Sequence, residues 1–248
     1  MKREVLSPNI ARITFELTSD GGALQGWKAG EAVTLDFSPE LDNGYAHMQD
    51  DDPQALNDDY VRTFTVSSPP STAKSGEKAE LQITIRRKGP ATGLLWRYNP
   101  RVELTLPVLG FGGTAGFLMD GQGEKVFVAG GVGITPLIAQ APGILSSGNG
   151  LSVLWGVRDE DLGFVEDSFK RIEGLAAATT LFVTGSGEGE VEDRVKGLGA
   201  RVEKRRMGEG DLGSYKGRNF YVCAGDEVMK AVLGWLEGEK VAYESFSY

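Results

Sequence analysis

The stretch that most constrains how this chain folds is residues 125–139, KVFVAGGVGITPLIA. It opens with a short apolar run, 126–129, which has a charged residue before it and glycines after it. Such a run is typical of a strand buried on both faces of a parallel sheet. Three of the next four residues are glycines, Gly130, Gly131 and Gly133, so no side chain there obstructs another group from approaching the backbone closely.

The turn is expected to lead into a helix, with Thr135 at the N-cap and Pro136 at the first helical position. A glycine turn before a helix N-terminus is typical of a pyrophosphate site, because free backbone N–H groups and the helix dipole face the anion. The usual dinucleotide fingerprint has its third glycine where this chain has Pro136. The pattern therefore leaves two interpretations open, a phosphate site or a tight strand-to-helix turn in an α/β domain.

Composition excludes several classes of protein. A chain of 248 residues allows one large domain or two of ordinary size, and its net charge of −9 argues against binding to nucleic acid or an anionic membrane. The single cysteine excludes a disulfide framework and a four-cysteine iron–sulfur cluster within the chain, and it favours a reduced, cytoplasmic location. There is no apolar run of the ~20 residues that a membrane span needs, and no signal peptide.

Hydrophobic patterns divide the chain into a β part and an α/β part. Apolar and polar residues alternate in four runs that predict an antiparallel sheet or small barrel: 13–17, 33–37, 81–85 and 102–106. After Gly123, buried-strand patterns at 126–129, 151–155, 181–183 and 220–223 alternate with helical patterns at 136–145, 161–172, 191–196 and 227–236. That rhythm predicts a parallel sheet with helices. We place the domains at residues 1–118 and 119–248. The strand pattern begins almost directly after Met1, which is compatible with a piece of a longer protein.

Residues 39–60 form an acidic stretch that contains no lysine or arginine. We interpret it as a solvated loop, and His47 as a loop residue. The acidic residues lack the spacing of a ligand set, so no metal site is predicted.

Three motifs in order carry a resemblance to a known family: YVRTFTVSS at 60–68, IRRKGPATGLL from Ile85, and AGGVGITP at 129–136. A fourth, VCAG at 222–225, follows near the C-terminus. Together they resemble the ferredoxin–NADP reductase superfamily over nearly the whole chain. The resemblance implies an N-terminal antiparallel β-barrel that binds a flavin, followed by a parallel-sheet domain that binds NAD(P)H.

The resemblance implies that the strand at 61–65 binds the flavin. Arg62 would pair with the flavin pyrophosphate, Phe64 would pack against the ring, and Thr65 would hydrogen-bond near the redox-active nitrogen, which makes Thr65 a candidate catalytic residue. Thr63 belongs to the same binding strand. A second segment would hold the flavin phosphates through Gly89, Thr92 and Gly93. The alternative for Thr92 is an ordinary helix N-cap.

For the dinucleotide, the resemblance implies a site at Gly131, Gly133, Thr135 and Pro136. Cys223 would lie near the nicotinamide carbon that gives up hydride, which makes it a candidate catalytic residue, and Gly225 would line the same site. This chain has Asp226 where the family often has proline, which changes the local charge. The alternative for Cys223 is a small core residue at the end of a buried strand.

The C-terminal segment also resembles a family feature, an aromatic residue that covers the flavin face where nicotinamide docks. Phe246 is the first candidate for this ring and Tyr248 the second, while Glu244 would sit near Cys223 and assist with proton or charge management. Glu244 and Phe246 are therefore candidate catalytic residues. The alternative is an ordinary edge strand through Val241, Tyr243, Ser245 and Ser247.

Arg158 follows the second strand of the α/β part, where a basic residue could reach a 2′-phosphate and favour NADPH. Asp159 would oppose a phosphate, and the cluster at 204–206 is a second candidate. The alternative is a surface arginine, so the choice between NADH and NADPH stays open.

These features predict an oxidoreductase in which NAD(P)H passes a hydride to bound flavin, which then releases electrons to an acceptor protein or domain that the sequence does not identify. FAD is expected because Arg62 and the segment at 89–92 suggest a pyrophosphate site; FMN is the alternative. The rival function is a non-catalytic flavin- or nucleotide-binding module that acts as a docking or regulatory subunit.

Overall fold

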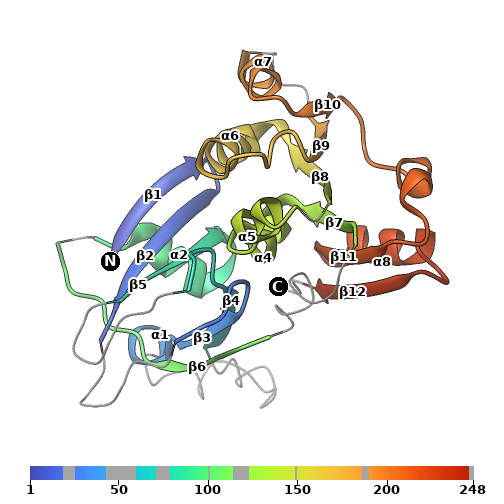
Figure 1. The fold of residues 1–248 in the computed structure, drawn as a ribbon. Helices are drawn as coiled ribbons and strands as arrows, with labels where there is room; N and C mark the ends of the chain where they lie inside the picture. Colours follow the sequence, from blue (N-terminus) through green and yellow to red (C-terminus); the bar gives the residue numbers. More distant parts are fainter. Residues whose placement is uncertain are drawn as a thin grey trace, which may run out of the picture.

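The computed structural model describes residues 1–18, 26–42, 60–70, 79–99, 101–113, 123–148, 150–185 and 190–245. Its N-terminal half contains two three-stranded antiparallel sheets (Figure 1). One has the order β1 (Lys2–Ser7), β2 (Ile10–Leu17), β5 (Ala79–Arg86), and the other β4 (Val61–Thr65), β3 (Ala32–Asp36), β6 (Val108–Gly112). A bridge between Val66 and Ile83 joins the two sheets.

One apolar core lies between these sheets, and the predicted alternation supplies it. Its fully buried members include Ile13, Val33, Leu81 and Ile83. Two short helices border the core: α1 (Ser38–Leu41) and α2 (Gly89–Arg97). Three of the four predicted β runs are confirmed, because each coincides with β2, β3 or β5.

The fourth predicted run, 102–106, is wrong as a strand. The chain there has no regular structure, and β6 begins only at Val108. Leu104 and Leu106 still pack half-buried against the core, which explains the alternation. Pro107 has no N–H to donate to a ladder, and its carbonyl accepts a single hydrogen bond of 3.0 Å from the Asp36 N–H. Sheet pairing therefore starts after the proline.

The C-terminal half is a six-stranded parallel sheet, as predicted (Figure 1). Its order is β10 (Arg201–Glu203), β9 (Thr179–Thr184), β8 (Leu151–Arg158), β7 (Lys125–Gly130), β11 (Asn219–Ala224), β12 (Lys240–Ser245). The order reverses beside β7, since β8 lies on one side of it and β11 on the other. In open α/β sheets the crevice beyond the strand ends at such a switch point is where ligands bind.

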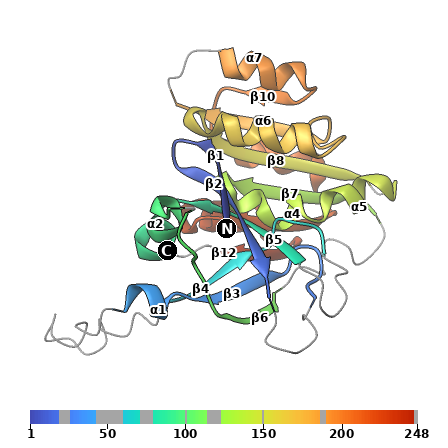
Figure 2. The same ribbon diagram turned by 90° about the vertical axis from the view of Figure 1, so that its left-hand side faces the viewer.

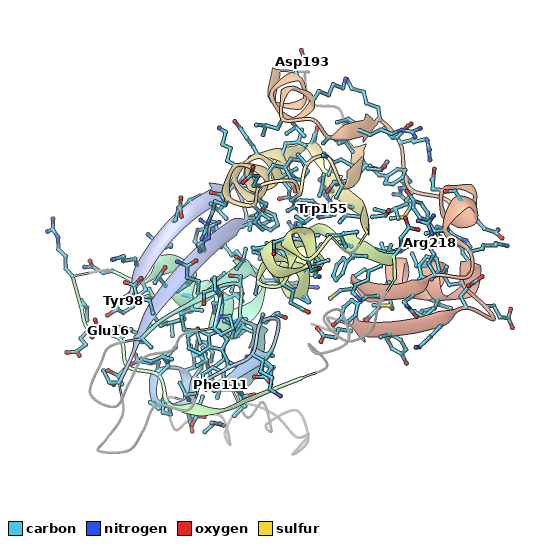
Figure 3. The ribbon with its side chains drawn as sticks, viewed as in Figure 1. Glu16, Tyr98, Phe111, Trp155, Asp193 and Arg218 are labelled. Atoms are coloured by element: carbon cyan, nitrogen blue, oxygen red, sulfur yellow. The ribbon has the colours of Figure 1, made fainter. Side chains whose placement is uncertain are left out.

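Helices cover both faces of this sheet (Figure 2). They are α4 (Thr135–Ile138), α5 (Ala141–Ser146), α6 (Leu162–Arg171), α7 (Glu190–Gly197) and α8 (Asp226–Trp235), with 3-10 turns at η2 (Gly131–Ile134), η3 (Asp159–Asp161) and η4 (Glu209–Tyr215). On β7, Phe127 and Ala129 belong to one core and Val126 and Val128 to the other. The apolar run is therefore buried on both faces, as expected. Trp155, labelled in Figure 3, lies in the first of these cores.

The helix after the glycine turn differs from the prediction in two ways. The 3-10 turn η2 comes first, so Ile134 is the N-cap and Thr135 and Pro136 occupy the first two helical positions. The predicted helix at 136–145 is also two helices, because α4 ends at Ile138 and α5 starts at Ala141 with Pro142 in its first turn. Pro142 has no N–H to donate to the Ile138 carbonyl four residues earlier, while proline is well tolerated in a first turn, and this accounts for the break.

The β1–β2 hairpin packs against α6, so the two halves are in contact (Figures 1 and 2). Arg12 of β2 forms ion pairs with Asp167 of α6 and with Glu4 of β1. The Ser7 hydroxyl donates a 3.0 Å hydrogen bond to the buried Asp161 carboxylate. These contacts fix the position of the sheet that contains β1 and β2 relative to the parallel sheet.

The predicted boundary at 118/119, the acidic residues 43–59 with His47, and residues Phe246 and Tyr248 lie outside the described residues. The segment 240–245 is an edge strand, β12, paired with β11. Within the described ranges no helix combines the length and apolar character that crossing a bilayer requires.

Candidate functional site

Two neighbouring cavities meet at the switch point of the sheet. The first, about 640 Å³, lies between β4, β5 and the start of α2, and we call it the β-domain cavity. The second, about 690 Å³, lies beyond the carboxyl ends of β7, β8 and β9 and beside α8, and we call it the sheet-end cavity. Arg86 and Lys88 line both cavities. A bound molecule in one cavity would therefore lie next to a molecule in the other.

The flavin-binding strand predicted from the sequence lines the β-domain cavity with four consecutive residues, Arg62, Thr63, Phe64 and Thr65. Thr65 is buried, whereas Thr63 is exposed and its hydroxyl lies 3.1 Å from that of Thr34 on β3. The Phe64 ring meets Phe37 edge-on with centroids 6.1 Å apart. The Arg62 guanidinium donates a 2.8 Å hydrogen bond to the Val61 carbonyl. The cavity thus has an aromatic wall, hydroxyls and a cation on one strand.

The start of α2 forms another wall of this cavity through Gly89 and Thr92. Gly89 has φ +77°, a conformation that glycine adopts without strain. Thr92 is not the N-cap, since Lys88 holds that position. Its hydroxyl nevertheless caps the helix, because it accepts a 2.8 Å hydrogen bond from the Lys88 N–H and donates to the Lys88 carbonyl. Gly93 is buried one step further along the helix.

The glycine turn is held from two sides and reaches both cavities. The Trp155 indole donates a 2.8 Å hydrogen bond to the Gly131 carbonyl, and Gly131 has φ +55° and lines the sheet-end cavity. A Cβ on Gly133 would overlap the carbonyl oxygen of Cys223, so the turn lies directly against the end of β11. Thr135 lines the β-domain cavity, and Pro136 is buried behind it. The turn therefore separates the two cavities while contributing to each.

Cys223 lies inside the core at the end of β11, in register with Ala129 on one side and Glu244 on the other. Burial raises the pKa of its thiol far above the ordinary value, and the Glu244 carboxylate raises it further. The thiol is accordingly protonated and neutral at physiological pH. The strand enters the sheet-end cavity two residues later, at Gly225.

Arg158 lines the sheet-end cavity at the end of β8 with an exposed side chain, 3.4 Å from the Glu160 carboxylate. Of the second basic cluster, Arg206 also lines this cavity. Arg205 instead binds Asp211 through two hydrogen bonds of 2.6 and 2.7 Å, which lower the pKa of the Asp211 carboxyl.

Sequence reasoning missed Arg86, Lys88 and Asp161 as site residues. The Arg86 guanidinium lies 2.5 Å from the Asp161 carboxylate, which is 1% exposed. A signal for Arg86 was present: Ile83 and Ile85 point to the core, so Arg86 shares the opposite face of β5 with Thr84, which lines the β-domain cavity. Asp161 comes from the loop after β8 and carries no such signal.

No family model matches this chain. The stachydrine N-demethylase reductase subunit Stc4 of Rhizobium meliloti (strain 1021) is 27% identical over 143 residues, which are 57% of this chain and 34% of that protein. This chain thus spans about a third of the length of that relative.

Solved structures resemble nearly the whole chain. The flavohem-like FAD/NAD-binding domain of nitric oxide dioxygenase from Vibrio cholerae matches with a TM-score of 0.65 at 17% identity, over 99% of this chain and 95% of that one. A ferredoxin NADP+ reductase from Neisseria gonorrhoeae with bound FAD and NADP matches with a TM-score of 0.56 at 14% identity, over 96% and 93%. A type IV self-sufficient cytochrome P450 monooxygenase matches with a TM-score of 0.66 at 19% identity, over 99% of this chain and 27% of that one. At these identities the likeness establishes the fold.

Proposed function

We propose that this chain, which has the two-domain fold of the ferredoxin–NADP reductase superfamily, is a flavin-dependent NAD(P)H oxidoreductase that passes electrons on to a partner. The observation that carries the proposal is the pair of adjoining cavities that share Arg86 and Lys88. Hydride transfer requires two cofactors to meet with reacting atoms ~3–3.5 Å apart. Two neighbouring cavities that share lining residues near the sheet switch point suit that requirement.

The β-domain cavity fits a flavin. Phe64 and Ile85 offer an apolar wall for a ring system, while Arg62 and the first N–H groups of α2 offer a cationic end for phosphate. When bound there, the flavin supplies the two-electron chemistry. In this proposal Arg62 and Gly89 hold phosphate, Phe64 packs on the ring, and the Thr65 hydroxyl donates to a ring nitrogen. FAD suits the extended set of phosphate-binding groups; FMN is the alternative.

The sheet-end cavity fits a nicotinamide dinucleotide. In this proposal the Gly131 turn and Arg86 hold its pyrophosphate, Arg158 contacts a 2′-phosphate, and Cys223 and Glu244 pack near the nicotinamide end. Phe246 or Tyr248 would cover the flavin face until nicotinamide displaces it. The roles of Gly131, Arg86 and Arg158 rest on the family resemblance and on the lining of the cavity, whereas those of Cys223, Glu244 and the C-terminal aromatics rest on the resemblance alone.

The acceptor is proposed to be a separate protein or a domain outside this chain. The name of the relative describes the reductase subunit of an N-demethylase, which supports a role as the electron-supplying component of a system with more than one subunit.

One experiment tests the activity directly. The purified protein is expected to be yellow, and NADPH or NADH should bleach its flavin absorbance under anaerobic conditions. A protein that binds flavin but stays oxidised with both coenzymes would instead support the rival, non-catalytic module.

A variant of Arg62 tests the flavin assignment. Removing one partner of a charge-assisted pair commonly costs ~2–5 kcal/mol, so Arg62→Ala should lose most of its flavin on gel filtration. The exposed Arg101→Ala is a matched control for loss of an arginine. Unchanged flavin affinity on titration of Arg62→Ala would refute the assignment.

A further inference from the structure

We propose that Asp161 is a positioning residue that holds Arg86 at the junction of the two cavities, and so links the contact between the domains to dinucleotide binding. This inference rests on the proposed function, because it takes the ligand of the sheet-end cavity to be a nicotinamide dinucleotide. Asp161 lines the sheet-end cavity and is not among the residues that line the β-domain cavity.

Asp161 receives a partner on each carboxylate oxygen, and both partners come from the other domain. The Ser7 hydroxyl of β1 donates to Oδ1 at 3.0 Å, and the Arg86 guanidinium of β5 donates to Oδ2 at 2.5 Å. The carboxylate is 1% exposed and the Arg86 side chain 22%. A buried charge with so little solvent around it depends on these partners. The three hydrogen-bonded side chains, which we call the Ser7–Asp161–Arg86 relay, therefore have a defined geometry.

The relay holds Arg86 beside the glycine turn, where phosphate is expected, and the nitrogen nearest the turn is Nη2, which also donates to Asp161. A Cβ built on Gly131 would lie 3.2 Å from the Arg86 terminal nitrogen, so the guanidinium sits against the glycine turn. Arg86 lines both cavities from this position. An arginine already fixed by a carboxylate loses less rotamer freedom when it binds an anion, so its hydrogen bonds contribute more to affinity.

Charge alone predicts the opposite effect of Asp161, which makes the inference testable. A carboxylate beside a phosphate site repels the ligand, so neutralising it should tighten binding if Asp161 merely offsets the charge of Arg86. If Asp161 positions Arg86, neutralising it should weaken binding. Asp161→Asn keeps the size of the side chain and an oxygen for Ser7, and removes the ionic hold on Arg86.

The same interface supplies a matched control. Arg12 and Asp167 also form an ion pair between the domains, with side chains 7% and 22% exposed. Neither residue is among those that line the two cavities. Asp167→Asn therefore loosens the domain contact to a similar extent without touching Arg86.

The experiment titrates NADP+ and NAD+ into the flavin-loaded wild type and the variants Asp161→Asn, Asp167→Asn, Arg86→Gln and Arg86→Gln/Asp161→Asn, and measures Kd and the limiting rate of flavin reduction. We expect Asp161→Asn to raise Kd about tenfold, the scale of one charge-assisted hydrogen bond, with the limiting rate within about twofold. Asp167→Asn should stay within about twofold in Kd, and the double variant should bind no more weakly than Arg86→Gln.

Tighter or unchanged binding by Asp161→Asn, or equal losses with Asp167→Asn, would overturn the inference while leaving the proposed function intact. A wild type that binds neither nucleotide would overturn both. Should Asp161→Asn fail to fold, Arg86→Lys decides the matter. It keeps the charge but loses the fork that contacts both Asp161 and the ligand, so severalfold weaker binding is expected and wild-type affinity refutes the relay.

Discussion

Replacing Gly133 by alanine should separate the glycine turn from the end of β11. The added Cβ would overlap the Cys223 carbonyl oxygen and stand 2.7 Å from its carbonyl carbon. Carbon atoms in contact lie about 3.5–4.0 Å apart, so the two backbones must part by roughly 1 Å. Both groups in the overlap are main chain, one in η2 and the other in β11, so no side chain can rotate to relieve it. Overpacking of this kind costs about 1–3 kcal/mol, and each kcal/mol lowers Tm by about 2–4 °C in a chain of this size.

The rate of flavin reduction should fall further than the loss of stability alone would explain. The turn lines both cavities, and a misplacement of about 1 Å at a reacting geometry can cost on the order of 100-fold in rate. We would measure Tm by circular dichroism and the anaerobic rate of flavin reduction by stopped flow. Gly213→Ala is the control, because Gly213 also lies in a 3-10 turn, η4, lines neither cavity, and its Cβ would meet no atom within 4 Å. A Gly133→Ala protein as stable and as fast as Gly213→Ala would refute the close-approach argument.

Three other predictions address the remaining proposals. If Arg158 contacts a 2′-phosphate, Arg158→Ala should lower kcat/KM for NADPH by about tenfold and leave NADH nearly unchanged; equal loss with both coenzymes would exclude this role. If a C-terminal aromatic covers the flavin, deleting residues 245–248 should strengthen the charge-transfer band with nicotinamide, and deleting only 247–248 tells whether Tyr248 or Phe246 is the ring; an unchanged spectrum contradicts the cover. Arg205 lowers the pKa of Asp211, so the native state binds fewer protons than the unfolded state and this stabilisation is present above the ordinary carboxyl pKa of about 4 and lost as the pH falls through the native value. Asp211→Asn should therefore lower the free energy of unfolding by about 0.5–1 kcal/mol at pH 7 and by less at pH 3, and an equal loss at both pH values would argue against the linkage.

Local patterns in the sequence were enough to predict the parallel sheet. The run 126–129 is apolar at every position, and this reflects the two cores that β7 separates, one containing Phe127 and the other Val128. Helix boundaries were less predictable, because the 3-10 turn η2 shifts the N-cap from Thr135 to Ile134. The same limit applies to 102–106, where an alternating pattern reports packing of Leu104 and Leu106 but not the hydrogen bonds that make a strand.

Contacts between distant segments could not be predicted this way. Ser7 and Asp161 are 154 positions apart, and Arg86 and Asp161 are 75 apart, so no periodicity or short motif relates them. They meet because β1 and β5 belong to one sheet, and that sheet packs against η3, η2 and α6 of the other half. The candidate site was thus predictable strand by strand, whereas the way its two halves share Arg86 was not.

The catalytic role of Cys223 stays a prediction, and the state of its thiol shows what that role can involve. Its thiol is buried and its pKa is raised by that burial, so it offers neither a thiolate nor a charge at physiological pH. What its position offers is a backbone carbonyl against which the glycine turn packs, and a small side chain that fits the core beneath. If that is its contribution, Cys223→Ser and Cys223→Ala should both keep the turn in place, and the larger Cys223→Leu should displace it. If Cys223→Ala lowered the rate of flavin reduction as much as Cys223→Leu does, the sulfur itself would take part in hydride transfer.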